Sequence, residues 1–226
     1  LAMKLFIDTS NIEQIKKYRA FKIFTGVTTN PALLSKEKGN PLDTLKKILE
    51  IMEDKPVSAQ VTSDSYTDMI KQGLKLSKIS NSIVVKLPAN ENGFKALVEL
   101  SSQGIKTNIT LCFDPSVATM FAQQGANYVS MILGRSDDFN LNQQTLIKRT
   151  RKIFDKHSLD NKILAASLRN PFHVELAMRQ GADILTIPPS TIEMLFDNPL
   201  TNSGSGDFKK MWLNLSEQDR QDYDIS

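Results

Sequence analysis

The stretch "SIVVKLPANENGFKALVELSSQGIKTNITLCF", residues 82–113, decides the fold. It opens with a β-rich run at 82–88, continues through 93–104 with apolar residues every three or four positions, and returns to a β-rich run at 106–113. This order predicts a strand, a helix and a second strand parallel to the first. Lys86 lies inside the first run, where an unpaired ammonium group is strongly unfavourable. We therefore expect Lys86 to be paired, displaced toward water at the strand end, or neutral for a chemical purpose.

The same alternation runs through most of the 226 residues. Segments with helical spacing separate the β-rich runs, and several of these segments end in a "QG" pair before the next run. The pattern predicts a single (β/α)8 barrel, with a doubly wound open sheet as the alternative. The β-rich runs are at 4–8, 24–30, 57–62, 82–88, 106–113, 128–133, 162–168 and 184–189.

The end of the sequence has a different character. The segment "TNSGSGD", 201–207, predicts a flexible connector, and the following residues carry the only tryptophan, Trp212, with Met211 and Leu215 on one helical side. We expect a catalytic barrel at 3–206 and a helical tail at 207–226. The tail would belong to the same domain or contact another subunit of an oligomer.

Composition excludes several classes of protein. The formal charge is only +3 and the lysines are dispersed, so we expect no nucleic-acid partner, although a small anionic ligand is compatible. No apolar stretch approaches the roughly 18 residues that span a bilayer, so we expect no membrane association. The single cysteine, Cys112, and the lack of a signal-peptide pattern favour a cytoplasmic protein. His157 and His173 lack metal-binding spacing and there is only one cysteine, so we expect no metal. We also expect no cofactor, and "SGSG" at 203–206 lacks the lysine and spacing of a phosphate-binding loop.

Polar side chains cluster at the ends of the predicted strands. The functional face of such a barrel lies at the carboxyl ends of the strands, and these residues alternate with apolar ones, so one phase can point inward. The polar residues are Asp8, Thr28, Asn30, Gln60, Thr62, Lys86, Asn108, Thr110, Ser130, Ser167 and Arg169.

Each of these residues also has a purely structural interpretation. Asp8 suits a helix cap, an isolated threonine or serine hydroxyl commonly satisfies a backbone group, and Lys86 suits an ion pair with Asp8. Structural roles explain single positions well. They explain less well why seven strands end in this way.

A neutral, desolvated lysine is a nucleophile toward carbonyl carbon. If Lys86 forms an iminium, cleavage of the adjacent carbon–carbon bond needs a base, and Asp8 is the carboxylate at a strand end. Gln60 and Thr110 are suited to hold a water for imine formation and hydrolysis. Arg135 and Arg169 are suited to bind a phosphate.

These residues occur in motifs that resemble the small members of the transaldolase family, which include transaldolases and fructose-6-phosphate aldolases. The similarity covers residues 3–212 and rests on motifs in order and with family-like spacing. The motifs are "FIDTSN", "GVTTNPALLSKE", "VVKLP", "GIKTNITLCF", "GRSDD", "AASLRNPFHV" and "NPLT".

The resemblance implies a metal-free class I aldolase-type enzyme of carbohydrate metabolism, in the pentose phosphate pathway, acting on sugar phosphates and forming pentamers or decamers. It implies that Lys86 is the Schiff-base lysine and Asp8 the acid/base. The remaining roles it implies are a catalytic water at Thr110, helped by Gln60; dihydroxyacetone contacts at Asn30 and Asn108; further pocket contacts at Thr28 and Ser130; and phosphate contacts at Arg135, Ser167 and Arg169.

Two positions depart from the usual transaldolase pattern. Gln60 stands where transaldolases have a glutamate, as in the aldolases, and an amide cannot accept a proton from water. Ile132 stands where transaldolases have phenylalanine and the aldolases tyrosine, whereas Asn108 and Ser130 match transaldolases. We therefore expect transfer of a dihydroxyacetone unit from a ketose phosphate such as fructose 6-phosphate to an aldose phosphate, with fructose-6-phosphate aldolase activity as the alternative and a non-catalytic sugar-phosphate-binding barrel as a further one.

Overall fold

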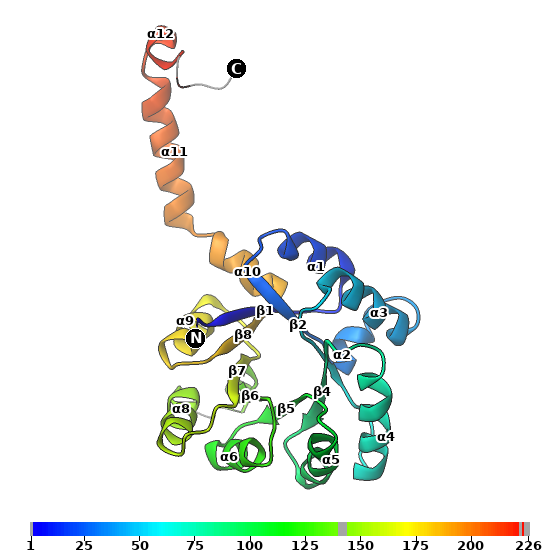
Figure 1. Cartoon of the computed structure of the whole chain (residues 1–226). Coiled ribbons are helices and arrows are strands. Elements are labelled where there is room, and N and C mark those ends of the chain that lie inside the picture. The colour runs from blue at the N-terminus through cyan, green and yellow to red at the C-terminus, as the bar shows by residue number, and fades with distance from the viewer. Residues whose placement is uncertain (1, 140–143, 222, 224–226) are drawn as a thin grey trace.

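The computed structural model describes residues 2–139, 144–221 and 223. Eight parallel strands close into a barrel in sequence order, and helices surround it (Figure 1). The predicted (β/α)8 barrel is confirmed over the open sheet. The strands are β1 (Lys4–Asp8), β2 (Phe24–Thr28), β3 (Val57–Gln60), β4 (Ile83–Pro88), β5 (Thr107–Cys112), β6 (Tyr128–Ile132), β7 (Lys162–Ala166) and β8 (Ile184–Ile187).

Helices α1 to α10 lie around the barrel, as the alternating pattern predicts, whereas α11 and α12 lie away from it (Figure 1). In the described residues they are α1 (Ile12–Arg19), α2 (Pro31–Leu34), α3 (Pro41–Met52), α4 (Tyr66–Ser77), α5 (Glu91–Ser102), α6 (Pro115–Gln123), α7 (Gly134–Asp137), α8 (Leu146–Lys156), α9 (Pro171–Arg179), α10 (Pro189–Phe196), α11 (Pro199–Leu213) and α12 (Glu217–Arg220). None of the helices in this part of the chain combines the length and the apolar character needed to cross a membrane.

Most even-numbered strand residues point into the barrel, and most odd-numbered ones point toward the helices. The exceptions are Phe24, Leu111 and Cys112, which lie beside register shifts in β2 and β5. Phe6, Leu164 and Ile184 form a small apolar cluster that is separate from the main core. A Cβ atom on Gly26 would lie 2.5 Å from the Phe6 ring, so the ring occupies the space that Gly26 leaves open. The closed floor beneath the site is therefore apolar and tightly packed.

The main core lies between the strands and the helices. Odd-numbered residues such as Ile7, Val85 and Ile109 pack there against buried residues of the helices, including Ile48 of α3 and Leu97 of α5. Buried side chains on both faces explain why the strand sequences read as nearly continuous apolar runs. The polar residues at the strand ends are exceptions that this packing does not require.

Asparagine side chains begin four of the helices that follow strands. Asn11 accepts a hydrogen bond from the backbone N–H of Gln14, which starts α1, and Asn30 accepts one from Leu33, which starts α2. Asn90 and Asn170 start α5 and α9 in the same way. Such caps fix the loops after the strands, where the polar residues gather.

Helix α11 extends away from the barrel and carries the chain toward its C-terminus (Figure 1). The prediction of a flexible connector at 201–207 is wrong, because these residues lie inside α11. Asn198 caps the helix by accepting a hydrogen bond from Leu200 N–H at 2.9 Å, and Pro199 occupies its first turn. These start signals outweigh the low helix propensity of the two glycines that follow. Positions 222 and 224–226 of the expected tail lie outside the described residues.

Candidate active site

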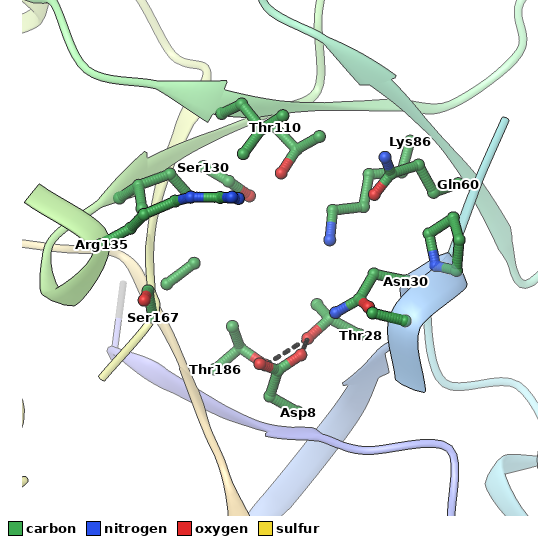
Figure 2. Close-up of a pocket in the computed structure, with 15 residues that line it drawn as sticks. Asp8, Thr28, Asn30, Gln60, Lys86, Thr110, Ser130, Arg135, Ser167 and Thr186 are labelled. Atoms are coloured by element: carbon green, nitrogen blue, oxygen red, sulfur yellow. Dashed lines mark hydrogen bonds between the residues drawn. The ribbon is translucent and has the colours of Figure 1, made fainter. Parts of the chain in front are cut away.

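A cavity of about 430 Å³ opens at the carboxyl ends of the strands (Figure 2). Nine of the eleven residues to which the family resemblance assigns a role line this cavity, whereas Asn108 and Arg169 do not. Each of the eight strands, or the loop that follows it, contributes at least one lining residue. The lining residues are Asp8, Thr28, Asn30, Pro31, Ala32, Gln60, Lys86, Thr110, Leu111, Ser130, Ile132, Arg135, Ala166, Ser167 and Thr186.

Lys86 projects from β4 into the cavity and is only 8% exposed. Its Nζ donates a hydrogen bond to the backbone carbonyl oxygen of Thr29 at 3.2 Å, and within the described part of the chain it forms no ion pair. Burial lowers the pKa of Lys86, and the charge of Asp8 opposes this shift only in part. Lys86 was expected to be paired, displaced toward water, or neutral for a chemical purpose. These observations favour the third explanation, an amine whose neutral form is favoured by burial.

Asp8 projects from β1 into the same cavity. Burial raises the pKa of the Asp8 carboxyl group, while Lys86 and a hydrogen bond from Thr28 act in the opposite direction. Thr28 Oγ1 donates that hydrogen bond to Asp8 Oδ1 at 2.7 Å. Asp8 is not the cap of the following helix, since Asn11 takes that role. Its carboxyl group therefore has no structural role as a helix cap.

Lys86 and Asp8 together provide an amine whose pKa is lowered and a carboxyl group whose pKa is raised. In each of them burial disfavours the charged form, so the amine is a better nucleophile and the carboxyl group a better proton acceptor than the same groups in water. This combination suits chemistry in which an amine adds to a carbonyl group while a nearby carboxylate removes a hydroxyl proton.

Gln60 and Thr110 lie on the strands that flank β4. Gln60 is the register partner of Lys86 on β3, and Thr110 is the partner of Pro88 on β5. Both side chains line the cavity, with Thr110 opposite Asp8 in Figure 2. An amide and a hydroxyl group at these positions can hold a water beside the amine.

Asn108 of β5 is fully buried and does not line the cavity. Its Nδ2 donates to Ser58 Oγ at 3.1 Å, and its Oδ1 accepts from Ser130 Oγ at 2.7 Å. Ser130 itself lines the cavity. Asn108 is therefore held between two buried hydroxyl groups and orients Ser130, and its contact with a ligand stays a prediction.

Arg135 and Ser167 form the opposite side of the cavity from Lys86 (Figure 2). Ser167 has a φ of 58°, in the left-handed region, and its carbonyl oxygen accepts a hydrogen bond from Gly134 N–H at 2.9 Å. A Cβ atom on Gly134 would lie 2.3 Å from that oxygen, so only glycine permits this approach of the two loops. The close contact places a guanidinium group and a hydroxyl group on adjacent segments, an arrangement that suits an anion.

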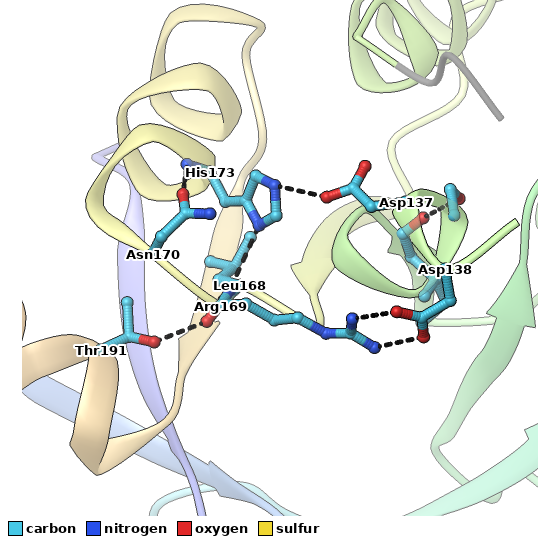
Figure 3. Close-up of polar contacts among 9 residues, drawn as sticks. Asp137, Asp138, Leu168, Arg169, Asn170, His173 and Thr191 are labelled. Carbon is cyan, nitrogen blue, oxygen red and sulfur yellow. Dashed lines mark hydrogen bonds and ion pairs between the residues drawn. The ribbon is translucent and has the colours of Figure 1, made fainter. Parts of the chain in front are cut away.

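Arg169 does not line the cavity, and its guanidinium group is paired with Asp138 (Figure 3). Its two terminal nitrogens donate to the two carboxylate oxygens of Asp138 at 2.5 and 2.8 Å. Beside this pair, His173 Nε2 lies 3.0 Å from Asp137 Oδ2, and His173 Nδ1 accepts from Arg169 N–H at 3.2 Å. Two neighbouring aspartates of the "GRSDD" motif thus connect the end of α7 to the loop after β7, through Arg169, and to the first turn of α9, through His173.

Thr186 lines the cavity from β8 but was not predicted from the sequence. Its Oγ1 lies 2.6 Å from Thr28 Oγ1 (Figure 2). The only signal was its parity within 184–189, because it shares the phase of Ile184 and precedes the strand end. Leu111 and Ala166 also line the cavity. They were not predicted, because an apolar residue in a strand does not by itself indicate a binding site.

Comparison with known proteins places the geometry in context. Residues 5–225 match the family described as Transaldolase/Fructose-6-phosphate aldolase. A "Probable transaldolase" of Thermodesulfovibrio yellowstonii is 46% identical over 215 residues, covering 95% of this chain and 100% of the relative. Proteins of the same description from Clostridioides difficile and Nitrosopumilus maritimus are 45% and 42% identical, covering 95% and 93% of this chain and 99% and 95% of theirs.

Proposed function

This chain is an enzyme that belongs to the transaldolase/fructose-6-phosphate aldolase family, and we propose that it transfers a dihydroxyacetone unit from a ketose phosphate to an aldose phosphate through a Schiff base on Lys86. Fructose 6-phosphate is the proposed donor. The observation that carries the proposal is that Lys86 and Asp8 open onto one cavity in which burial opposes the charge of each.

Imine formation is the first proposed step. The neutral amine of Lys86 adds to the ketone carbon of the donor, and loss of water from the carbinolamine leaves an iminium. A water held by Gln60 and Thr110 carries protons between the amine and the departing oxygen. The lowered pKa of Lys86 supports this step, since a protonated amine has no electron pair to donate.

Carbon–carbon cleavage and transfer follow. The Asp8 carboxylate removes the proton of the hydroxyl group next to the scissile bond, the bond breaks, and its electron pair moves into an enamine conjugated with the Lys86 nitrogen. The aldehyde product leaves as a carbonyl compound. The enamine then attacks the acceptor aldehyde, Asp8 returns the proton to the new hydroxyl group, and water hydrolyses the imine.

The remaining lining residues suit substrate binding. Asn30 uses its Oδ1 to cap α2, so its amide nitrogen is the group that it offers to a sugar hydroxyl. Thr28 and Ser130 present hydroxyl groups to the same cavity. We assign the phosphate to Arg135 and Ser167, joined by Arg169 when this side chain leaves Asp138.

Fructose-6-phosphate aldolase activity is the alternative, and Gln60 favours it. Glutamine at this position is the residue that the aldolases have, and in their reaction the enamine takes up a proton from water and free dihydroxyacetone is released after hydrolysis of the imine. An assay with fructose 6-phosphate, with and without erythrose 4-phosphate, separates the two reactions. Glyceraldehyde 3-phosphate that appears only with the acceptor supports transfer, and its release without the acceptor supports the aldolase.

Borohydride reduction tests the shared chemistry. We expect that fructose 6-phosphate and borohydride leave a stable adduct on Lys86, found by mass spectrometry of peptides. A protein that turns over substrate without any adduct on Lys86 would refute the Schiff base. We also propose that the enzyme acts in the cytoplasm, in the pentose phosphate pathway.

We also propose a homo-oligomer, a pentamer or decamer, in which α11 contacts a neighbouring subunit. Leu200, Phe208 and Met211 on this helix are 83%, 74% and 68% exposed. Large apolar side chains exposed together on a projecting helix are typical of a surface that another chain covers. Phe208 and Met211 support an oligomer contact within 207–226, while the catalytic barrel is assigned to 3–206, and Leu200 extends the exposed surface into the part of α11 that precedes this boundary.

A further inference from the structure

The hydroxyl groups of Thr28 and Thr186 form a chain that ends on the Asp8 carboxyl group. Asp8 Oδ1 accepts from Thr28 Oγ1 at 2.7 Å, and Thr28 Oγ1 lies 2.6 Å from Thr186 Oγ1. The three residues come from β1, β2 and β8, which are neighbours in the barrel. Thr28 and Thr186 are each 1% exposed, so bulk water does not compete for these hydrogen bonds.

The number of protons fixes the direction of this chain. A threonine hydroxyl group carries one proton, and an ionised carboxylate only accepts. While Asp8 is ionised, the Thr28 proton must point to Asp8, so Thr186 must donate to Thr28. Once Asp8 has taken up a proton, its own hydroxyl can donate to Thr28, and the Thr28 proton can turn toward Thr186. The chain reverses by rotation of hydroxyl groups, without movement of a heavy atom.

We propose that Thr186 is a positioning residue for the acid–base step, acting through Thr28 as the far end of a reversible hydrogen-bond relay to Asp8. The inference rests on the proposed role of Asp8. It assigns Thr186 a part in the proton transfer rather than a contact with the sugar. Thr28, which the sequence predicted as a substrate contact, then has the primary role of donating a hydrogen bond to Asp8.

The relay favours the ionised carboxylate more than the neutral one. A hydrogen bond to a charged acceptor is roughly twice as strong as one between neutral groups, and each donor in a chain strengthens the next. The other charged side chains that line the cavity are Lys86 from β4 and Arg135 from α7. Neither is altered by a change at Thr186, which isolates the contribution of the relay.

The test replaces Thr186 by valine, which keeps the shape of the side chain and removes the hydroxyl group. We expect the acidic limb of the kcat–pH profile for fructose 6-phosphate cleavage to move to higher pH by roughly half a unit. This corresponds to about a threefold lower rate on the limb and little change on the plateau. Thr186→Ser should restore the wild-type profile, and Thr186→Ala supplies the measurement if the valine variant does not fold.

Thr107→Val is the matched control. Thr107 lies on β5, is fully buried, and its hydroxyl group has no partner among the described residues. Its loss should leave the pH profile unchanged. Asp8→Asn identifies the limb, because the limb must disappear with the carboxylate.

Several outcomes would overturn the relay. They are an unshifted limb in both Thr186→Val and Thr186→Ala, and a uniform fall in kcat at every pH that serine does not rescue. Borohydride trapping on Lys86 is measured in parallel. Normal trapping with an unshifted limb refutes the relay alone, whereas absence of trapping in the wild-type protein refutes the proposed function itself.

Discussion

Lys86 of β4 and Gln60 of β3 are register partners, so their side chains leave neighbouring strands at the same level of the barrel. Both side chains line the cavity. In the proposed mechanism, a group that replaces the amide would act on the water that serves the Lys86 nitrogen. This pairing makes position 60 the most direct way to alter the proposed water relay.

Replacing Gln60 by glutamate should increase the transferase rate. A carboxylate at this position can accept a proton from the water, which an amide cannot. We expect kcat for transfer from fructose 6-phosphate to erythrose 4-phosphate to rise by at least about tenfold. Gln60→Met, of similar length but without hydrogen-bonding groups, should be slower than the wild type. An unchanged or reduced rate in Gln60→Glu would contradict the proposed relay.

Replacing Lys86 by methionine should separate activity from stability. Loss of the amine removes the nucleophile, so kcat should fall by at least about 10³-fold and borohydride should trap no adduct. The same change removes a buried group that burial disfavours in its charged form, so the free energy of unfolding should rise by about 1 kcal/mol. Lys71→Met on the exposed face of α4 is the control and should change neither. Retained turnover in Lys86→Met would exclude the Schiff base.

Asp8→Asn should stabilise the protein in a pH-dependent way. Burial raises the pKa of Asp8 in the folded state above 3.8, its ordinary value. Between these two pKa values the folded state binds more protons than the unfolded state, so stability falls as pH rises through this window. The asparagine variant lacks that loss. Its advantage in urea midpoint over the wild type should grow as pH rises above 3.8 and then level off. An advantage that shrinks over this range would show that the Asp8 pKa is lowered instead.

Asp138→Asn should strengthen binding of phosphorylated substrate. The variant weakens the ion pair that holds Arg169 outside the cavity, and so makes this guanidinium group available to a phosphate. We expect the KM for fructose 6-phosphate to fall about threefold with kcat unchanged, because exposed ion pairs contribute modestly. Asp68→Asn, which removes the partner of Lys71 on α4, is the control. A higher KM in Asp138→Asn would mean that Asp138 positions Arg169 for binding.

Charged substitutions on α11 should reduce the size of the assembly. Phe208→Asp combined with Met211→Asp places charge on the surface that we propose a neighbouring subunit covers. We expect sedimentation analysis to show smaller species, while circular dichroism shows an intact barrel. Lys209→Asp, on the same helix, tests for a general effect of charge. An unchanged sedimentation coefficient would exclude α11 from the interface.

Local chemistry made most of the barrel and of its cavity predictable. Alternation of β-rich and helical runs gave the order of elements, and parity within the strands brought Asp8, Gln60, Lys86 and Thr110 to one cavity. These features depend only on side chains close together in the sequence.

The features that were not predicted depend on long-range partners. The direction of Arg169 is set by Asp138, 31 residues earlier in the chain. The role of Thr186 is visible only beside Thr28, 158 residues away. The helical state of 201–207 reflects a cap and a proline that precede it, whereas the glycines within it suggested a connector. In each case the contact that decides the conformation lies outside the short segment on which the prediction was based.

The shared phase of the inward side chains has a consequence for changes in chain length. Deleting one residue within β4 ahead of Lys86 would turn the amine from the cavity toward the surrounding helices, while deleting two would restore its direction at a different height. Insertions and deletions within a strand therefore disrupt the cavity, whereas those outside the strands leave the direction of its side chains unchanged. Engineering of this enzyme by insertion or deletion should be confined to the loops that lead into the strands, at the end of the barrel opposite the cavity, because the loops that follow the strands carry Asn30, Arg135 and Ser167.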